Sequence, residues 1–437
     1  MEYVNEIIVS FFILILTMGL GAPVAVAFFL TTIYLLIATG INPGFLITYS
    51  ASMITNYVLV AVPLFILAGG IMEIGGIGEK LLGLMSGTRL GKKTHGIGTM
   101  SIIACAIFGT ISGSSNATVT AIGSLVMPKL QKVGYRSGEA ASLVANSGML
   151  GQLIPPSALM ILFAWCTNQS VMAAFLSSAV GGIILTTLFC IINYFEVRRR
   201  DDIVPIAEVE KASSGEKKKR DSAIPAILMP VIILGGIYGG IMTPVEAAAV
   251  AVIYAVPVCY FYYGKLNLKN IKEILIKSGR STGMVMFMIF AVSMLARTYT
   301  MLGLPEMLLN FLLGISENKY VLLFLINIFL ILIGMLMDDT SAMLLTAPLL
   351  MPVILKIGVD PIHFAGILAC NLGLGCITPP CAPVLYLASS VGNANVKTMF
   401  GHTGKLILFG WLPTLLIVTY LPDVTLVLAR LIMGYGG

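Results

Sequence analysis

Two adjacent carboxylates lie inside the otherwise apolar stretch GMLMDDTSAMLLTAPLLMP, residues 334–352. They belong to Asp338 and Asp339, and Thr340 follows them directly. One aspartate at the centre of a bilayer already costs about 3 kcal/mol on insertion scales. A membrane segment with two of them must offset that cost. Carboxylate and hydroxyl oxygens are ligands that hard cations prefer, so the stretch is a candidate cation-binding turn.

A second polar turn, SGSSNATVT at residues 112–120, offers hydroxyl and amide oxygens without a charge. Downstream of each turn a proline pair, Pro155-Pro156 or Pro379-Pro380, interrupts an apolar stretch. Proline removes a backbone donor and blocks the preceding helical turn, so each pair predicts a broken helix. The carbonyl groups that a break frees need partners, because hydrocarbon supplies none. A sodium ion is one such partner.

Pairing each polar turn with its own proline break predicts two sodium sites. The candidate ligands of the first site are Ser114, Ser115, Asn116, Gly148 and Gln152. Those of the second site are Asp338, Asp339, Thr340, Gly373, Gly375 and Thr378. The competing interpretation is that the polar residues only cap helices and that the glycines only allow close packing. The sequence does not decide between ligation through side chains and ligation through backbone carbonyls.

The half-helices at the breaks also present N-termini, whose positive dipole ends suit an anionic substrate. Candidate substrate contacts near the breaks are Asn146, Pro155, Asn371 and Pro379. Arg297 is the only cation that we place within a membrane span, and it can hold a carboxylate. It can also extend to the membrane surface, and we favour that interpretation.

The composition is that of a helical membrane protein. Of 437 residues, 58% are hydrophobic and only 11% are charged, against about 25% charged in soluble domains. The mean hydropathy is +0.97, and apolar runs long enough to span a bilayer recur from end to end. The seven cysteines lie in apolar sequence, so we expect small buried core residues.

The positive charges set the predicted topology. The loop 196–222 contains RRR and KKKR, which places it in the cytoplasm. Apolar segments 97–128 and 320–355 are too long for one crossing and break at the polar turns, so we predict two re-entrant hairpins and about ten full crossings. Nearly all Lys and Arg then fall inside, and both termini lie outside. The net charge of +6 follows from this topology and gives no reason to expect a nucleic acid partner.

The two halves of the chain form an internal repeat. At an offset of 224 positions, LVMPKLQKVG (125–134) aligns with LLMPVILKIG (349–358), and LGQLIPPSA (150–158) aligns with LGCITPPCA (374–382). In the same register SSN (114–116) aligns with DDT (338–340). Because the two copies have opposite charge topology, the repeat is inverted, an architecture typical of secondary transporters with a binding site near the bilayer midplane.

These motifs together resemble a known family. PLFILAGGIM, SGSSNATVTAIGSLVMP, GQLIPPS, GMLMDDTSAMLLTAPLLMP and GCITPP are similar to the large membrane (M) subunit of tripartite ATP-independent periplasmic (TRAP) transporters. The resemblance covers essentially the whole chain. It implies sodium-driven import of an organic acid, such as a sialic acid or a C4-dicarboxylate, across the bacterial inner membrane. No cofactor is expected beyond sodium as the coupling ion.

The resemblance also implies partners and an elevator mechanism, in which a transport part slides against a scaffold. A soluble periplasmic substrate-binding protein (P subunit) would deliver the substrate, and a small four-helix membrane subunit (Q) would contact the scaffold. Because few residues precede the first span, we expect an unfused form with a separate Q chain. No nucleotide-binding motif of the type GxxxxGK[ST] is present in the sequence, which fits an ion-driven carrier.

The implied organisation divides the chain into two halves and a linker. The first half, 1–195, has a scaffold at 1–73, an arm at 74–95 and a transport part at 96–195. A flexible cytoplasmic linker, 196–222, follows. The second half, 223–437, has a scaffold at 223–302 with an amphipathic arm near 265–280, an external arm at 303–318 and a mainly transport part at 319–437.

Three other functions compete with this one. The nearest is a stand-alone sodium-coupled carboxylate symporter, which needs no binding protein. An intramembrane aspartyl protease would need a second carboxylate on a facing helix, and the other aspartates lie in loops or at span ends. A non-transporting assembly subunit has no use for polar turns and broken helices at membrane depth. We therefore predict a transporter and not an enzyme.

Overall fold

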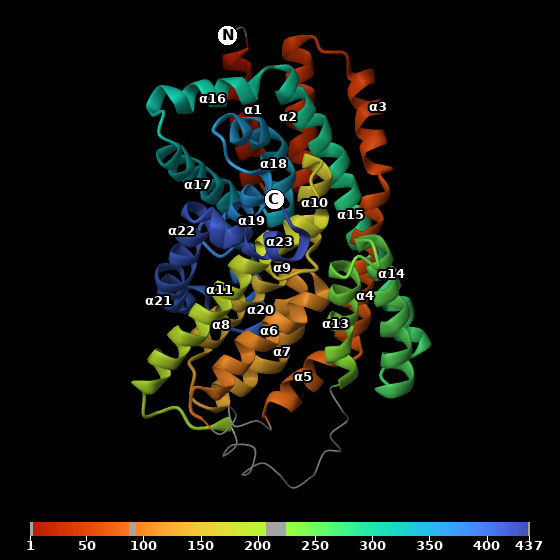
Figure 1. Ribbon diagram of the computed structural model, residues 1–437, viewed down its shortest axis with the longest axis vertical. Helices are drawn as coiled ribbons and strands as arrows, with labels where there is room; N and C mark the ends of the chain where they lie inside the picture. The colour runs from red at the N-terminus through yellow and green to blue at the C-terminus, as the bar shows by residue number, and fades with distance from the viewer. Residues whose placement is uncertain (1–2, 87–92, 207–223, 436–437) are drawn as a thin grey trace.

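The computed structural model describes residues 3–86, 93–206 and 224–435, and these ranges contain helices and connecting turns but no strand (Figure 1). The elements of the first half are α1 (Val4–Gly19), α2 (Val24–Thr39), α3 (Pro43–Ile54), η1 (Tyr57–Val60), α4 (Ala61–Ile74), α5 (Ile77–Ser86), α6 (Gly96–Ser112), α7 (Ser115–Lys132), α8 (Ser137–Gly148), α9 (Leu150–Leu153), α10 (Ala158–Thr167) and α11 (Val171–Arg198). Those of the second half are α13 (Ile224–Tyr238), α14 (Pro244–Pro257), η3 (Val258–Tyr262), α15 (Leu268–Met301), α16 (Leu304–Ile315), α17 (Lys319–Leu336), α18 (Asp339–Lys356), α19 (Pro361–Cys376), α20 (Pro383–Gly392), α21 (Val396–Leu406), η4 (Ile407–Trp411), α22 (Leu412–Tyr420) and α23 (Pro422–Met433).

Both predicted hairpins form, with their turns at the polar residues. In the first, α6 ends at Ser112, Gly113 adopts a left-handed φ of +60°, and Ser114 caps the start of α7. In the second, α17 ends at Leu336 and Asp338 caps the start of α18. A short polar side chain before the first helical residue satisfies backbone N–H groups that otherwise lack a partner. The polar turns therefore act as hairpin tips.

Both proline pairs break a helix, as predicted. The first break separates α9 from α10, and the helices on its two sides are bent by 43°. The second separates α19 from α20, with residues 377–382 outside any helix. The missing proline donors and the steric block on the preceding turn account for both breaks.

The two hairpins enter the molecule from opposite ends. Figure 1 shows α6 and α7 in the half that contains α5, and α17 and α18 in the half that contains α16. Their tips meet, because the Ser115 hydroxyl donates to the Asp339 carboxylate over 3.3 Å. These residues are 224 positions apart, so they are equivalent in the repeat. The pseudo-twofold axis of the inverted repeat therefore passes between them.

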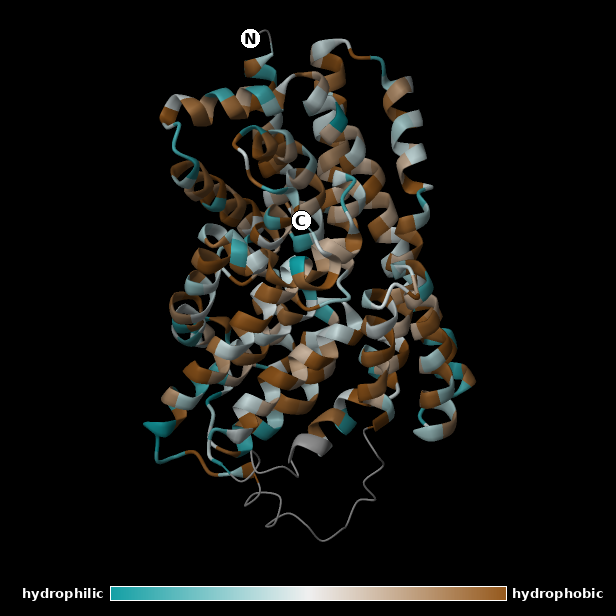
Figure 2. Ribbon diagram, viewed as in Figure 1, coloured by the Kyte–Doolittle hydropathy of each residue, from teal (hydrophilic) through white to brown (hydrophobic). Residues whose placement is uncertain are grey.

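The surface of the molecule suits a bilayer. Figure 2 shows hydrophobic residues over most of its length, and Phe12, Ile37 and Phe261 are each more than 70% exposed. Within the described residues seven helices are long and apolar enough to cross a membrane, and shorter apolar helices lie beside them. The chain is therefore a multi-span membrane protein. Ten crossings and periplasmic termini stay predictions.

The amphipathic arm predicted near 265–280 forms the first part of a long helix. Helix α15 runs unbroken from Leu268 to Met301, capped by the Asn267 side chain. No proline interrupts this range, and Gly279 and Gly283 have open space around them. The other two arms appear as separate short helices, α5 and α16, although residues 87–92 of the first lie outside the described residues.

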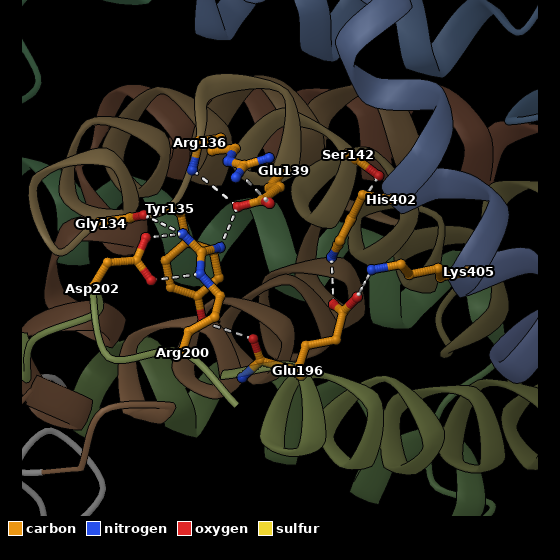
Figure 3. A network of polar contacts seen from close by, with 11 residues as sticks. Gly134, Tyr135, Arg136, Glu139, Ser142, Glu196, Arg200, Asp202, His402 and Lys405 are labelled. Atoms are coloured by element: carbon orange, nitrogen blue, oxygen red, sulfur yellow. Dashed lines mark hydrogen bonds and ion pairs between the residues drawn. The ribbon is translucent and has the colours of Figure 1, made fainter. Parts of the chain in front are cut away.

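The beginning of the linker docks on the first half of the chain (Figure 3). Helix α11 continues to Arg198, and most of the expected linker lies outside the described residues. Arg200 then donates to Glu139 over 2.6 Å, to Asp202 over 2.6 Å and to the Gly134 carbonyl over 2.9 Å. Ile203 is buried beside this cluster. A planar guanidinium with two carboxylates and a carbonyl makes charge-assisted hydrogen bonds that hold the segment in place.

Replacing Arg200 with alanine should lower the free energy of unfolding by about 1 to 3 kcal/mol, because Glu139 loses a charged partner in a half-buried setting. The thermal midpoint of the purified protein checks this, with exposed Arg198→Ala as the control. Arg200 lowers the pKa of the Asp202 carboxyl from 3.8 to about 2, so the Arg200–Asp202 pair stabilises the fold at neutral pH and this stabilisation is lost as pH falls from about 4 to about 2. Equal midpoints for both variants would contradict the assignment.

Candidate ion-binding site

At the point where the two tips meet, one carboxylate, that of Asp339, contacts residues of both halves. Asp339 accepts the Ser115 hydroxyl through Oδ2, and it accepts the Thr340 N–H over 2.8 Å and the Thr340 hydroxyl over 3.3 Å through Oδ1. Asp339 also lies in the first turn of α18, where the helix dipole favours a negative charge. Local hydrogen bonds and the dipole thus offset part of the cost of this charge, and lone pairs remain for a cation.

The Asp338 carboxylate caps a helix and does not contact the opposite tip. It accepts the Ser341 N–H over 3.1 Å and the Ser341 hydroxyl, so it caps α18. The Ser341 hydroxyl also contacts the Met288 sulfur of α15 at 2.7 Å. The two adjacent carboxylates are therefore unlike: Asp338 faces its own helix, and Asp339 faces the opposite tip.

The first tip packs against the first break, as predicted. The Gly113 carbonyl accepts the Ala158 N–H across the break over 3.3 Å. A Cβ at Gly151 would lie 2.8 Å from the Ser114 carbonyl oxygen. The Thr118 hydroxyl donates to the same carbonyl over 2.8 Å. Only glycine allows this close approach of two backbones, so Gly151 sets the distance between tip and break.

The second half contains a similar close approach of two glycines. A Cβ at Gly375 would lie 2.5 Å from Gly334 Cα, and one at Gly109 in the first half would lie 2.5 Å from Gly151 Cα. Gly151 and Gly375 are 224 positions apart. In each half a glycine of the broken helix therefore contacts a glycine near the hairpin tip. The predicted pairing of each hairpin with its own break is confirmed.

The core between the breaks contains polar atoms without protein partners. Both polar atoms of the Gln152 side chain and the hydroxyl of Ser157 are buried and unpaired, and Asn371 Oδ1 is unpaired as well. The Gln152 side chain is only 1% exposed and lies against Gly373 of the second half. A buried polar atom without a partner is costly and calls for a water or an ion. Hydroxyl, amide and carboxylate oxygens fit a hard monovalent cation as a transported co-substrate.

Other predicted ligands take positions that the pairing did not anticipate. Gly373 packs against Gln152 and the ring of Trp411, and not against the second tip. Gly148 packs against Val119 behind the first tip. Asn116 is exposed at the tip, and the Thr378 hydroxyl donates to the Leu374 carbonyl of α19 over 2.6 Å.

The candidate substrate residues are dispersed. The Asn146 side chain accepts the Trp411 indole N–H over 3.1 Å, and the Asn371 amide donates to Asn327 over 2.8 Å. These contacts hold helices together. The Asn146 amide also donates to the Ser142 carbonyl over 2.9 Å, so both of its polar atoms are paired, whereas Asn371 keeps Oδ1 for a ligand. Trp411 was missed, because a lone tryptophan in an apolar stretch has no pattern that marks it as a partner of Asn146.

Arg297 lies in an aromatic setting that is separate from the tips. Its guanidinium carbon is 5.7 Å from the Phe45 ring centroid and 5.4 Å from that of Tyr49, both on α3. A cation over aromatic faces at this distance is stabilised by the ring quadrupole. Arg297 therefore anchors α15 to α3, and among the described residues its ring contacts are with α3 and not with the tips.

The two breaks differ in exposure. Pro155 and Pro156 are buried, whereas Pro379, Pro380 and Cys381 are exposed. Cys381 therefore departs from our expectation of buried cysteines. It is the exposed one among the seven cysteines. The second break thus lies at the surface of the chain, and the first break lies in its interior.

A charged, membrane-impermeant thiol reagent should therefore react at Cys381 before the other cysteines and block transport. Cys381→Ser should abolish the inhibition, and bound substrate should slow the reaction. Mass spectrometry of the labelled protein locates the modified thiol. Dominant labelling at half-buried Cys190 would instead place the opening elsewhere.

Paired polar tips, broken helices and inverted halves define the class of protein as a membrane transporter of the inverted-repeat type. A similar fold occurs in the crystal structure of the YdaH transporter of Alcanivorax borkumensis, with a TM-score of 0.63 at 12% identity over 90% of this chain and 89% of that one.

Sequence relationships give the family. The model of the DctM component of tripartite ATP-independent periplasmic transporters matches residues 10–424. The sialic acid TRAP transporter large permease SiaM of Vibrio cholerae is 33% identical over 95% of this chain and 96% of its own length. The C4-dicarboxylate large permease DctM of Pseudomonas aeruginosa is 33% identical over 85% and 86%. The isethionate permease DctMQ of Oleidesulfovibrio alaskensis is 31% identical over 98% of this chain and 67% of its own length. This chain belongs to the large-permease family of TRAP transporters, and it is a transporter and not an enzyme.

Proposed function

We propose that this permease imports an organic acid anion by coupling it to the inward flow of sodium. The observation that carries the proposal is the Ser115–Asp339 contact, which places one carboxylate between the tips of the two hairpins. Sodium bound at Asp339 compensates the charge of this carboxylate. The bound cation in turn draws the substrate anion to the N-termini of α7 and α18.

The substrate class follows from the chemistry of the tips and is supported by the relatives. Their names specify C4-dicarboxylates, sialic acid and isethionate, which are all organic anions. Two helix N-termini with hydroxyl donors suit a carboxylate or sulfonate group. We infer an organic acid of this kind, delivered by a periplasmic substrate-binding protein. A small membrane subunit completes the complex in the bacterial inner membrane.

The movement that we propose is an elevator step. The part that carries both hairpins and both breaks slides as one unit against α1–α4 and α13–α15. The mutual contact of the tips supports this, because hairpins joined at their tips move together. The exposed second break and the buried first break correspond to a site that is open to one side only.

Uptake into liposomes tests the proposal. The permease with its small subunit is reconstituted, and radiolabelled organic acids are supplied with candidate binding proteins, with and without an inward sodium gradient. Accumulation should require both the binding protein and sodium. Accumulation in vesicles that contain only this chain would instead identify a stand-alone sodium symporter. Accumulation without sodium would overturn the coupling.

A further inference from the structure

An apolar cavity of about 200 Å³ lies beside the second hairpin and apart from the ion site. Four helices line it: Phe11 comes from α1, Leu304 from α16, Phe329 from α17 and Leu349 from α18. These helices adjoin one another at the α16 end of the molecule (Figure 1). The cavity therefore lies between the second hairpin and a helix of the proposed scaffold.

The cavity walls are held in place by packing contacts, and their lining presents no unpaired polar group to a water molecule. The Phe11 ring stacks on Tyr299 with centroids 5.4 Å apart, and the Tyr299 hydroxyl is hydrogen-bonded to Ser10 at 2.9 Å. Thr346, the polar residue of the lining, donates its hydroxyl to the Ala342 carbonyl of its own helix over 2.7 Å. An apolar cavity of about 150 Å³ in a soluble protein stays dry and binds benzene or xenon. This one has room for a hydrocarbon group and no partner for a water molecule.

The mouth of the cavity opens towards lipid-facing surface. Leu304 and Leu349 are buried at 4% and 5% exposure, whereas Phe11 and Phe329 are only partly buried. Their chain neighbours Phe12, on α1, and Ile328, on α17, are 71% and 41% exposed. Large apolar side chains that are exposed on membrane-spanning helices suit contact with acyl chains. At these positions the bilayer can present hydrocarbon directly at the mouth.

We propose that the end of a membrane lipid's acyl chain occupies this cavity. A hydrocarbon chain restores the dispersion contacts that the empty walls lack. The occupied cavity joins α1 to α17 and α18, so the chain must withdraw or shift whenever the second hairpin slides along α1. Binding of the lipid is independent of the transport function, but this effect on the sliding step rests on the proposed elevator.

Fluorescence quenching by brominated lipid tests the binding. Phe329→Trp places a reporter at the cavity, and Ile328→Trp places a matched one on the lipid face at nearly the same depth. Both proteins are reconstituted in phosphatidylcholine brominated in its acyl chains, and the signal of Trp165 and Trp411 in the unsubstituted protein is subtracted. Although residue 329 is less exposed, its tryptophan should be quenched at least as strongly as the one at 328.

Filling the cavity provides the second measurement. Leu349→Phe in the Phe329→Trp protein should remove the excess quenching and leave the Ile328→Trp protein unchanged. Weaker quenching at 329 than at 328, in line with its smaller exposure, would overturn the proposal. If Phe329→Trp fails to fold, Leu308→Trp reports from the α16 side with the same expectation. The rate of uptake by the Leu349→Phe variant is measured separately. An unchanged rate after loss of the excess quenching would refute the effect of the lipid on transport but not its binding. Failure of uptake in the unsubstituted protein would count against the proposed function but not against lipid binding.

Discussion

Asp339→Asn should abolish sodium-dependent uptake while the protein still folds. The substitution keeps the size of the side chain and its hydrogen bonds to Thr340, but it removes the charge that faces Ser115. Loss of an outer-shell partner alone weakens metal binding by 10- to 100-fold, so loss of a charged ligand should reduce the affinity for sodium by about 100-fold or more. Uptake against sodium concentration in liposomes measures the effect.

Asp338→Asn is the matched control. Asparagine caps a helix about as well as aspartate, so this variant should keep α18 intact. Its uptake should retain a sodium response, although at reduced affinity because one nearby negative charge is lost. If Asp339→Asn keeps the normal sodium response while Asp338→Asn loses it, the roles of the two carboxylates are reversed and the ion lies nearer to Ser341.

Gly375→Ala should separate the second hairpin from the second broken helix and inactivate the protein. Its Cβ would lie 2.5 Å from Gly334 Cα and 3.0 Å from the Met335 nitrogen, and neither atom can rotate away. Inserting atoms into a packed core usually costs 1–3 kcal/mol, and a clash between two backbones should reach about 3 kcal/mol. The expected result is a lower thermal midpoint together with loss of uptake.

Gly283→Ala provides the control for that variant. Gly283 lies within α15, and a Cβ there meets nothing within 4 Å. Alanine in a helix interior is more stable than glycine by about 0.5–1 kcal/mol, so the midpoint should stay or rise. Gly151→Ala, at the equivalent position of the first half, should resemble Gly375→Ala. A folded and active Gly375→Ala would show that the close approach is not required.

The hairpins and breaks could be predicted because their signals are local. A proline pair or a run of polar residues contrasts strongly with an apolar background, and each acts on the helix in which it lies. The repeat then paired each hairpin with its own break, and the glycines Gly151 and Gly375 confirm that pairing. Family membership was predicted from the same motifs, because they occur together in one order.

Contacts between the halves could not be predicted in the same way. The alignment of the two halves shows that Ser115 and Asp339 occupy equivalent positions in the repeat. Their contact, however, depends on how the two halves pack together. The direction of Gly373 towards Gln152 and Trp411 also depends on tertiary packing. In α15 the amphipathic pattern of residues 266–279 suggested a surface arm, but no residue there ends the helix, so the pattern gave the polarity of the segment and not its path.

The position of Ser115 and Asp339 on the symmetry axis bears on how such a chain originates. If a duplicated ancestor had two identical halves, residues on the axis would meet their own copies. Two aspartates would repel each other, and two serines would carry no charge to hold an ion. Divergence at this pair places one carboxylate on the axis, where a perfectly symmetric molecule would have either two or none.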